Sequence, residues 1–189
     1  PILAPDGNGV LTENAPFHHL HQHGIFFCFL DVTGTLDNGN DLELENFFYE
    51  RPNSGYFHPD PLREPVLENN KVSWSVASRG YHRSDTQMFY EKEEWTFTDH
   101  GDSYTMDVTL SIEATIKISM KAHPYVGMFV RMPFVNESGG NGVNSEGFVN
   151  RDQAEASWLS VAMPIEGRTD SAGIGMMDHP DNVNHPARW

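Results

Sequence analysis

The stretch that decides the fold is Ser103–Lys121, which reads SYTMDVTLSIEATIKISMK. From Tyr104 to Met120 every even-numbered residue is apolar, and every odd-numbered residue is polar or charged. A period of two is typical of a β-strand with one buried face. At about 3.3 Å per residue the stretch would span about 60 Å, which is too long for one straight strand. We therefore expect either two strands that keep parity through a bend near Glu113-Ala114, or one long bent strand.

Shorter segments of strand-like composition lie on both sides of this stretch, at 24–32, 71–78, 88–97, 125–134, 156–163 and 172–177. Turn-forming Gly, Asn, Asp and Pro residues separate them. Residues 37–70 are the least regular region and are expected to form a long excursion over the sheet. Helix is expected for at most one or two turns, within 150–156. Short strands between such turns predict an all-β fold, and we favour an antiparallel β-sandwich with little helix over a barrel.

The composition limits the possible partners. The chain has 189 residues with a formal net charge of −15, and its length suits a single domain, residues 1–189. So acidic a surface repels phosphate backbones and anionic lipids, which argues against nucleic-acid and membrane-surface partners. The single cysteine, Cys28, excludes an internal disulfide and is most simply a small buried core residue.

The sequence leaves compartment and assembly open. No stretch approaches the roughly 20 apolar residues of a membrane span, so a soluble protein is expected. The chain starts at Pro1 rather than Met, which indicates a trimmed or partial chain, either cytoplasmic or exported after removal of a signal. A sandwich with open edge strands could also form an oligomer edge to edge.

A first group of candidate functional residues lies at 17–24, which read FHHLHQHG. If this segment is extended, His19, His21 and His23 share one face, and His18 lies on the other. Three imidazoles on one face are able to bind Zn²⁺ or Fe²⁺. In the alternative structural role, the rings only bond backbone or carboxylate groups at a strand edge. For the cluster as a whole we favour a function of some kind.

A second group lies at 177–186, which read MDHPDNVNHP. Each His-Pro step holds the backbone extended before the proline. Asp178, His179, Asn182 and His185 supply donors, acceptors and an acid or base within one loop, as a polyol ligand or a proton-transfer site requires. A rigid turn, in which the Asp and Asn side chains cap their own backbone, is an equal alternative.

Two charged features lie within strand-like segments. Arg131 lies in the apolar segment 125–134, so it must pair with a carboxylate or reach a cleft. A solvent-facing arginine or a structural ion pair is the alternative. Residues 91–95 read EKEEW, which indicates a charged strand, and Trp95 is favoured as a core residue over a sugar-binding platform.

Both ends of the chain carry a family resemblance. Residues 17–27 read FHHLHQHGIFF, residues 31–34 read DVTG, and residues 173–182 read GIGMMDHPDN. These segments resemble the HH…HG start and the D-H-P-x-N ending of the bacterial PmoA-type family, although Thr33 stands where that family has Asn. The resemblance implies a soluble all-β protein from carbohydrate-utilisation settings, with a supersandwich like that of aldose epimerases. It also implies further strands after Trp189, and therefore a domain truncated at its C-terminal end.

These observations favour a carbohydrate-active enzyme of the epimerase, lyase or hydrolase type, acting on a sugar or sugar acid without a cofactor or metal. His19 or His179 would be the general acid or base because the pKa of histidine lies near neutral pH, and Asp178 would be its partner. The residues expected to bind a small-molecule or oligosaccharide substrate are His18, His21, His23, Arg131, Asn182 and His185. This hypothesis requires residues 18–23 and 178–185 to share one pocket.

Two further functions stay open. A non-catalytic carbohydrate-binding module would use the same polar residues together with exposed aromatic rings such as Tyr56, Phe57 and Tyr81. A metal-dependent oxygenase or hydrolase would use the histidines at 18–23 as ligands, and it ranks third because histidines close in sequence easily point apart in space.

Overall fold

The computed structural model describes residues 1–49, 51–134, 139–150 and 153–189, and their regular secondary structure is β-strand without any helix. The prediction of an antiparallel all-β fold is confirmed, and no sheet in the described ranges closes into a barrel. The helical turns considered at 150–156 fall partly on residues 151–152, outside the described residues. The packing of the sheets into a sandwich stays a prediction.

The strands follow one another along the chain as β1 (Ile25–Cys28), β2 (Val32–Thr35), β3 (Tyr56–Pro59), β4 (Val66–Glu68), β5 (Lys71–Tyr81), β6 (Gln87–Asp99), β7 (Tyr104–Ala114), β8 (Lys117–Met120), β9 (Gly127–Val130), β10 (Asn141–Asn144), β11 (Trp158–Pro164) and β12 (Ser171–Met177).

The chain divides into two compact units. Unit 1 contains Pro1–Phe26 and Val130–Trp189, and unit 2 contains Phe27–Phe129. The boundaries between them fall within β1 and β9, which pair with each other. That residues 1–189 form a single domain, truncated at its C-terminal end, stays a prediction. In the described part of the chain no helix has the length and apolar character needed to cross a membrane.

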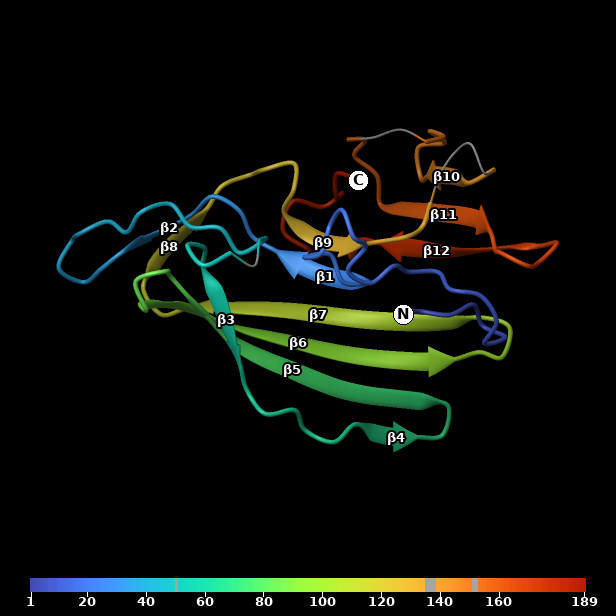
Figure 1. The fold of residues 1–189 in the computed structure, drawn as a ribbon, viewed down its shortest axis with the longest axis horizontal. Helices are drawn as coiled ribbons and strands as arrows, with labels where there is room; N and C mark the ends of the chain where they lie inside the picture. The colour runs from blue at the N-terminus through green and yellow to red at the C-terminus, as the bar shows by residue number, and fades with distance from the viewer. Residues whose placement is uncertain (50, 135–138, 151–152) are drawn as a thin grey trace. The chain divides into compact units, whose positions relative to one another are not determined.

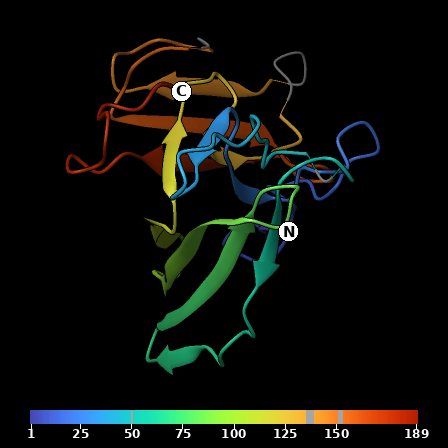
Figure 2. The same cartoon turned by 90° about the vertical axis from the view of Figure 1, so that its left-hand side faces the viewer.

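The largest sheet belongs to unit 2 and has the order β3–β5–β6–β7, with β4 also paired to β5 (Figures 1 and 2). In β7 the even-numbered residues from Tyr104 to Ile112 are half-buried and the odd-numbered ones exposed, as the alternation predicts. The pattern then continues into β8, which pairs with β2 in a different sheet. Two strands with one parity are therefore confirmed, and the break between them lies at Thr115-Ile116.

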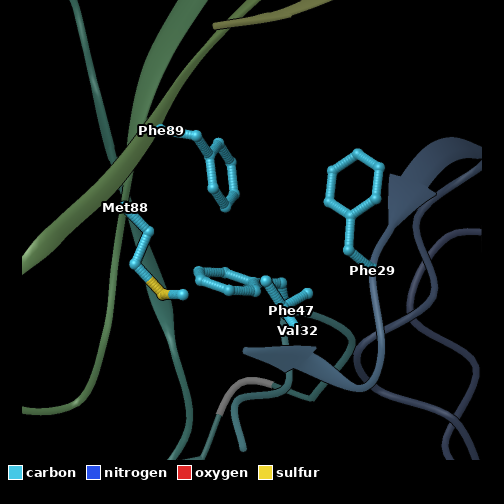
Figure 3. Close-up of a cluster of buried hydrophobic side chains, with 5 residues drawn as sticks. All are labelled: Phe29, Val32, Phe47, Met88 and Phe89. Atoms are coloured by element: carbon cyan, nitrogen blue, oxygen red, sulfur yellow. The ribbon is translucent and has the colours of Figure 1, made fainter. Parts of the chain in front are cut away.

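Unit 2 has an aromatic core. Figure 3 shows its buried side chains, which are Phe29, Val32, Phe47, Met88 and Phe89. Met88, Phe89 and Val32 have no exposed surface. Gly80 lies opposite Phe89 in the sheet, and a Cβ atom there would overlap the phenyl ring. The missing side chain of the glycine therefore makes room for the ring at the centre of the core.

The apolar segment 24–32 forms two strands rather than one. β1 ends at Cys28, and β2 begins at Val32 after Asp31, whose φ of 53° turns the chain. Cys28 is buried, as predicted, and donates its thiol hydrogen to the carbonyl oxygen of Tyr125 over 3.4 Å. Burial raises the pKa of the Cys28 thiol to about 12, despite a backbone hydrogen bond from Gly127. Cys28 is therefore a poor nucleophile at neutral pH.

Unit 1 contains the three-stranded sheet β10–β11–β12. Leu11, Met163 and Ile165 form its buried cluster, and Met132 and Ile174 are among the residues packed against it. Arg168 ties the first residues of the chain to this unit, because its Nη1 bonds Asp6 Oδ2 over 2.7 Å. The loop after β12 and the histidine segment 18–23 both belong to this unit.

Candidate functional site

The loop after β12 brings together an aspartate and a histidine. His185 Nδ1 lies 2.7 Å from Asp178 Oδ2. The same carboxylate accepts hydrogen bonds from the side chain of Asn182 (2.7 Å, to Oδ1) and from the backbone N–H of Ala187 (2.8 Å, to Oδ2). The Asp178 side chain is only 8% exposed, whereas that of His185 is 26% exposed. The carboxylate is thus enclosed by donors, while the imidazole reaches the surface.

These contacts determine the charge of Asp178 and the tautomer of His185. Burial alone would raise the pKa of Asp178, but the hydrogen bonds from Asn182, His185 and Ala187 outweigh it, so that the pKa lies below its usual value. An ionised carboxylate only accepts hydrogen bonds, so His185 donates through Nδ1. The neutral ring then carries its lone pair on Nε2, which is the arrangement of a general base oriented by a carboxylate.

The loop backbone holds this pair in place. Asp178 N bonds the carbonyl oxygen of Ser157 over 2.9 Å at the end of β12. Within the loop, Asn182 N bonds His179 O over 2.9 Å, and Asn184 has a φ of 63°. The left-handed conformation of Asn184 directly before His185 fits the tolerance of Asn for that region.

His179 and Asn182, both predicted as site residues, differ in their contacts with this pair. The His179 side chain is 71% exposed, and its Nδ1 accepts a hydrogen bond of 3.2 Å from the backbone N–H of Asp181. The structure thus pairs Asp178 with His185 rather than with the adjacent His179. Asn182 contacts the carboxylate of Asp178, so its described contact is one of positioning.

The histidine segment 18–23 is folded into turns rather than extended. His19 N bonds Pro16 O over 2.7 Å, and Gln22 N bonds His19 O over 3.0 Å. Ala15, just before the turns, has a φ of 48°, which is strained for a residue with a Cβ atom. The condition under which His19, His21 and His23 would share one face, an extended segment, is therefore not met.

The turns gather three of the four rings. The ring centroids of His18 and His19 are 4.8 Å apart, and those of His19 and His21 are 5.8 Å apart. His19 Nδ1 is buried and has no hydrogen-bond partner among the residues that the structure describes. His23 makes a contact of 3.0 Å between its Nδ1 and Asn14 Oδ1. Over the described ranges, no three His, Cys, Asp or Glu side chains are arranged to hold a metal ion.

Arg131 joins this cluster. Its Nε donates to Glu13 Oε2 over 2.9 Å, and its Nη2 lies 3.0 Å from His18 Nε2. Because a guanidinium only donates, His18 accepts through Nε2 and carries its proton on Nδ1 when neutral. Glu13 was missed by the sequence analysis, and it supplies the carboxylate that a half-buried Arg131 requires. Each of the two predicted segments thus has described partners of its own, and their meeting in one pocket stays a prediction.

A further acidic pair was missed in unit 2. Glu91 and Glu93 lie on β6 and are separated by one residue, so both face the same side of the sheet as Phe89. Burial raises the pKa of Glu91 to about 7, and the charge of Glu93 adds to the effect. Burial also raises the pKa of Glu93, against a hydrogen bond from Trp95. The sequence does contain a signal for this pair. Glu91 and Glu93 occupy the same alternate positions of the strand as Phe89 and Trp95, so all four side chains are expected on one face.

Comparison with known proteins gives a family. The model of a family described as of unknown function, DUF6807, matches residues 1–189. Neither a curated protein nor a solved structure matches the chain. The family description names no activity, so the function has to be argued from the geometry.

Proposed function

We propose, from the premise that the chain belongs to the DUF6807 family of unknown function, that it is an acid–base enzyme acting on a sugar or sugar acid. The observation that carries the proposal is the contact of 2.7 Å between His185 Nδ1 and the buried carboxylate of Asp178. The resemblance of both chain ends to the PmoA-type family supports carbohydrate as the substrate class. That part is analogy, whereas the acid–base chemistry is argued from the site.

The proposed step is a proton transfer at His185. Its Nε2 lone pair takes a proton from a carbon or hydroxyl of the substrate, and the ring becomes an imidazolium. The ionised Asp178 stabilises that positive charge through Nδ1–H, and the proton then returns from Nε2 to the product. This scheme suits the epimerase, lyase and hydrolase types, and it assigns to His185 the acid–base role that the sequence analysis expected of His179 or His19.

The neighbouring residues of the loop have supporting roles in this scheme. Asn182 and the backbone N–H of Ala187 hold the Asp178 carboxylate, which fixes the orientation of the His185 ring. His179 is exposed and is assigned to substrate contact at the rim of the loop. Arg131, His18 and His19 form a second polar group of unit 1, suited to hold hydroxyl or carboxylate groups.

The test is turnover with matched histidine variants. Aldoses, uronic acids and their oligosaccharides are incubated with the protein in D2O, and proton NMR follows both conversion and exchange of carbon-bound hydrogen. We expect His185→Gln to lower the rate of the converted substrate by about 10²–10⁴-fold, which is the usual contribution of a general acid or base. His100→Gln, the same change at an exposed histidine in the turn between β6 and β7, should stay within a few-fold of the wild type.

Circular dichroism confirms that both variants are folded. Equal rates for His185→Gln and the wild type would remove His185 from the mechanism. A wild-type protein that neither converts nor exchanges any member of the panel would count against the sugar enzyme as a whole.

A non-catalytic sugar-binding module is the second candidate, favoured by one observation in unit 2. The rings of Tyr56 and Tyr81 stack with centroids 5.3 Å apart, and Tyr56 is 41% exposed. Phe57, also expected among the exposed rings, instead packs against the buried core cluster. Binding of a sugar without conversion, abolished by Tyr56→Ala and unaffected by His185→Gln, would favour this module over the enzyme.

A further inference from the structure

The carboxyls of Glu91 and Glu93 lie beside uncharged residues of the neighbouring strands within unit 2. The register of the sheet gives Glu91 the neighbours Ser78 on β5 and Ile112 on β7. For Glu93 the corresponding neighbours are Val76 and Leu110. None of these four neighbours carries a charge. We call Glu91, Glu93 and the indole rings of Trp74 and Trp95 the carboxyl face.

Glu91 is an under-satisfied group. It is only 7% exposed, and its Oε1 accepts a single hydrogen bond, from the Ser78 hydroxyl at 3.5 Å. Its Oε2 is buried, and within the described ranges of the chain no group donates a hydrogen bond to it. An ionised carboxylate in such a place is unfavourable unless a cation or several donors compensate it. The raised pKa of Glu91, about 7, is the consequence of this shortage.

The face becomes more accessible along β6. Phe89 is fully buried, Glu91 nearly so, and Glu93 and Trp95 are half-buried. Trp95 Nε1 donates to Glu93 Oε2 over 2.7 Å, and the ring stacks on Trp74 with centroids 5.9 Å apart. Two carboxyls with no cationic partner among the described residues therefore lie next to two indole rings.

We propose that the carboxyl face binds an organic ammonium ligand, with its charged nitrogen at Glu91 and Glu93 and its apolar body against Trp74 and Trp95. An ammonium group supplies both the charge and the N–H donors that the carboxyls lack. Indole rings attract the same cation and pack against its alkyl or aryl groups. A neutral sugar would offer hydroxyls but would leave the charge uncompensated. The net charge of −15 also attracts cations to the protein.

This site uses no residue of the loop after β12, so it goes beyond the proposed function. The probes are two matched pairs, benzylamine with benzyl alcohol and glucosamine with glucose, which differ in an ammonium or hydroxyl group. Binding to the whole chain is followed by tryptophan fluorescence and by calorimetry. We expect benzylamine to bind at least ten-fold more tightly than benzyl alcohol. Its affinity should rise about ten-fold from pH 6 to pH 8, because Glu91 ionises over that range.

Variants locate the site. Glu91→Gln keeps the shape of the side chain, and it should weaken benzylamine binding at least ten-fold at pH 8 and reduce the pH dependence, of which Glu93 supplies the remainder. Glu93→Gln should also weaken binding, and it provides a second test if Glu91→Gln fails to fold. Glu94→Gln, exposed on the opposite side of the same strand, is the control and should bind as the wild type does.

Four outcomes would overturn the proposal. The first is equal binding of benzylamine and benzyl alcohol, and the second is no binding of either amine up to its solubility limit. The third is unchanged benzylamine affinity in a folded Glu91→Gln variant. Tighter binding of glucose than of glucosamine would likewise contradict the proposal, because it would show that the site prefers a neutral sugar to an ammonium ligand.

Discussion

Two regions of unit 2 each bury a glutamate, and they treat it in opposite ways. Glu45 is 1% exposed and Glu91 is 7% exposed, so burial does not distinguish them. Glu45 Oε2 accepts hydrogen bonds from Arg83 Nε (3.1 Å) and Arg83 N (2.9 Å), and its Oε1 accepts one from Asn46 N (2.9 Å). In the part of the chain that the structure describes, Glu91 accepts a hydrogen bond only from the Ser78 hydroxyl, at 3.5 Å.

The pKa values follow from these partners. Burial raises the pKa of Glu45, but Arg83 and the backbone N–H groups outweigh it, so the net shift is downward. At Glu91 burial is the largest influence and the charge of Glu93 adds to it, so the pKa rises to about 7. The donors around a buried carboxyl therefore decide whether it is a permanent ion that holds structure together or a group able to exchange a proton. The first describes Glu45, and the second is a common property of functional sites.

The largest effect on stability is expected when the carboxylate of Glu45 is replaced. Glu45→Gln removes the charge that faces Arg83, and we expect the free energy of unfolding at pH 7 to fall by about 4 kcal/mol. The lowered pKa of Glu45 means that its stabilisation is present above pH 4.5 and is lost as the pH falls further. The difference between variant and wild type should therefore shrink in acid, as measured by urea denaturation across pH.

Glu43 provides the matched control for that experiment. Its carboxylate lies 3.8 Å from Arg83 Nη1, but its side chain is 83% exposed. Glu43→Gln should therefore change stability by well under about 1 kcal/mol. A comparable loss in both variants would show that burial of the carboxylate has no part in the effect.

A smaller effect of opposite sign is expected at Glu91. Because its folded-state pKa is raised, the native protein is most stable with respect to this group below pH 4.5 and loses stability as the pH rises to about 7. A rise from 4.5 to about 7, at 1.36 kcal/mol per pH unit, corresponds to roughly 3 kcal/mol. Glu91→Gln should thus be stabilising by up to that amount at pH 8 and nearly neutral at pH 4.5, in urea denaturation without added ligand. A variant that is destabilised equally at both pH values would contradict this prediction.

The sequence predicts only part of the difference between Glu45 and Glu91. The alternation in β7 predicts which of its faces is buried. In the register of the sheet, Glu91 and Glu93 lie directly beside Ile112 and Leu110 of that face. Their parity matches Phe89 and Trp95, so a buried carboxyl pair was predictable from the same reasoning that located the strand. The alternation cannot predict which group pairs with a buried carboxylate. Arg83, the partner of Glu45, lies 38 positions away in the sequence.

The candidate site in unit 1 was likewise predictable from the sequence only in part. The composition of the loop after β12 indicated acid–base residues, but the choice of His185 over His179 as the partner of Asp178 depends on how the loop turns. The contact between Arg131 and Glu13 joins residues 118 positions apart, and no local pattern specifies it. At 18–23 the alternation of histidines would place three rings on one face only in an extended segment, and the turn bonds that begin at Pro16 exclude that conformation.

The smallest effect is expected at Glu94, an exposed glutamate of β6. Its comparison with the buried Glu45 and Glu91 tests whether a short ion-pair distance alone is enough to stabilise the fold. Glu94 Oε1 lies 2.7 Å from Lys92 Nζ, a distance shorter than any between Glu45 and Arg83, but the Lys92 and Glu94 side chains are 43% and 54% exposed. Water and salt screen such a pair, and two long side chains lose conformational freedom to form it. Lys92→Ala should therefore change the free energy of unfolding by less than about 0.5 kcal/mol at pH 7, and added salt should reduce the change further. A loss comparable to that of Glu45→Gln would mean that short ion pairs stabilise this sheet irrespective of burial, and the distinction between Glu45 and Glu91 would then need another cause.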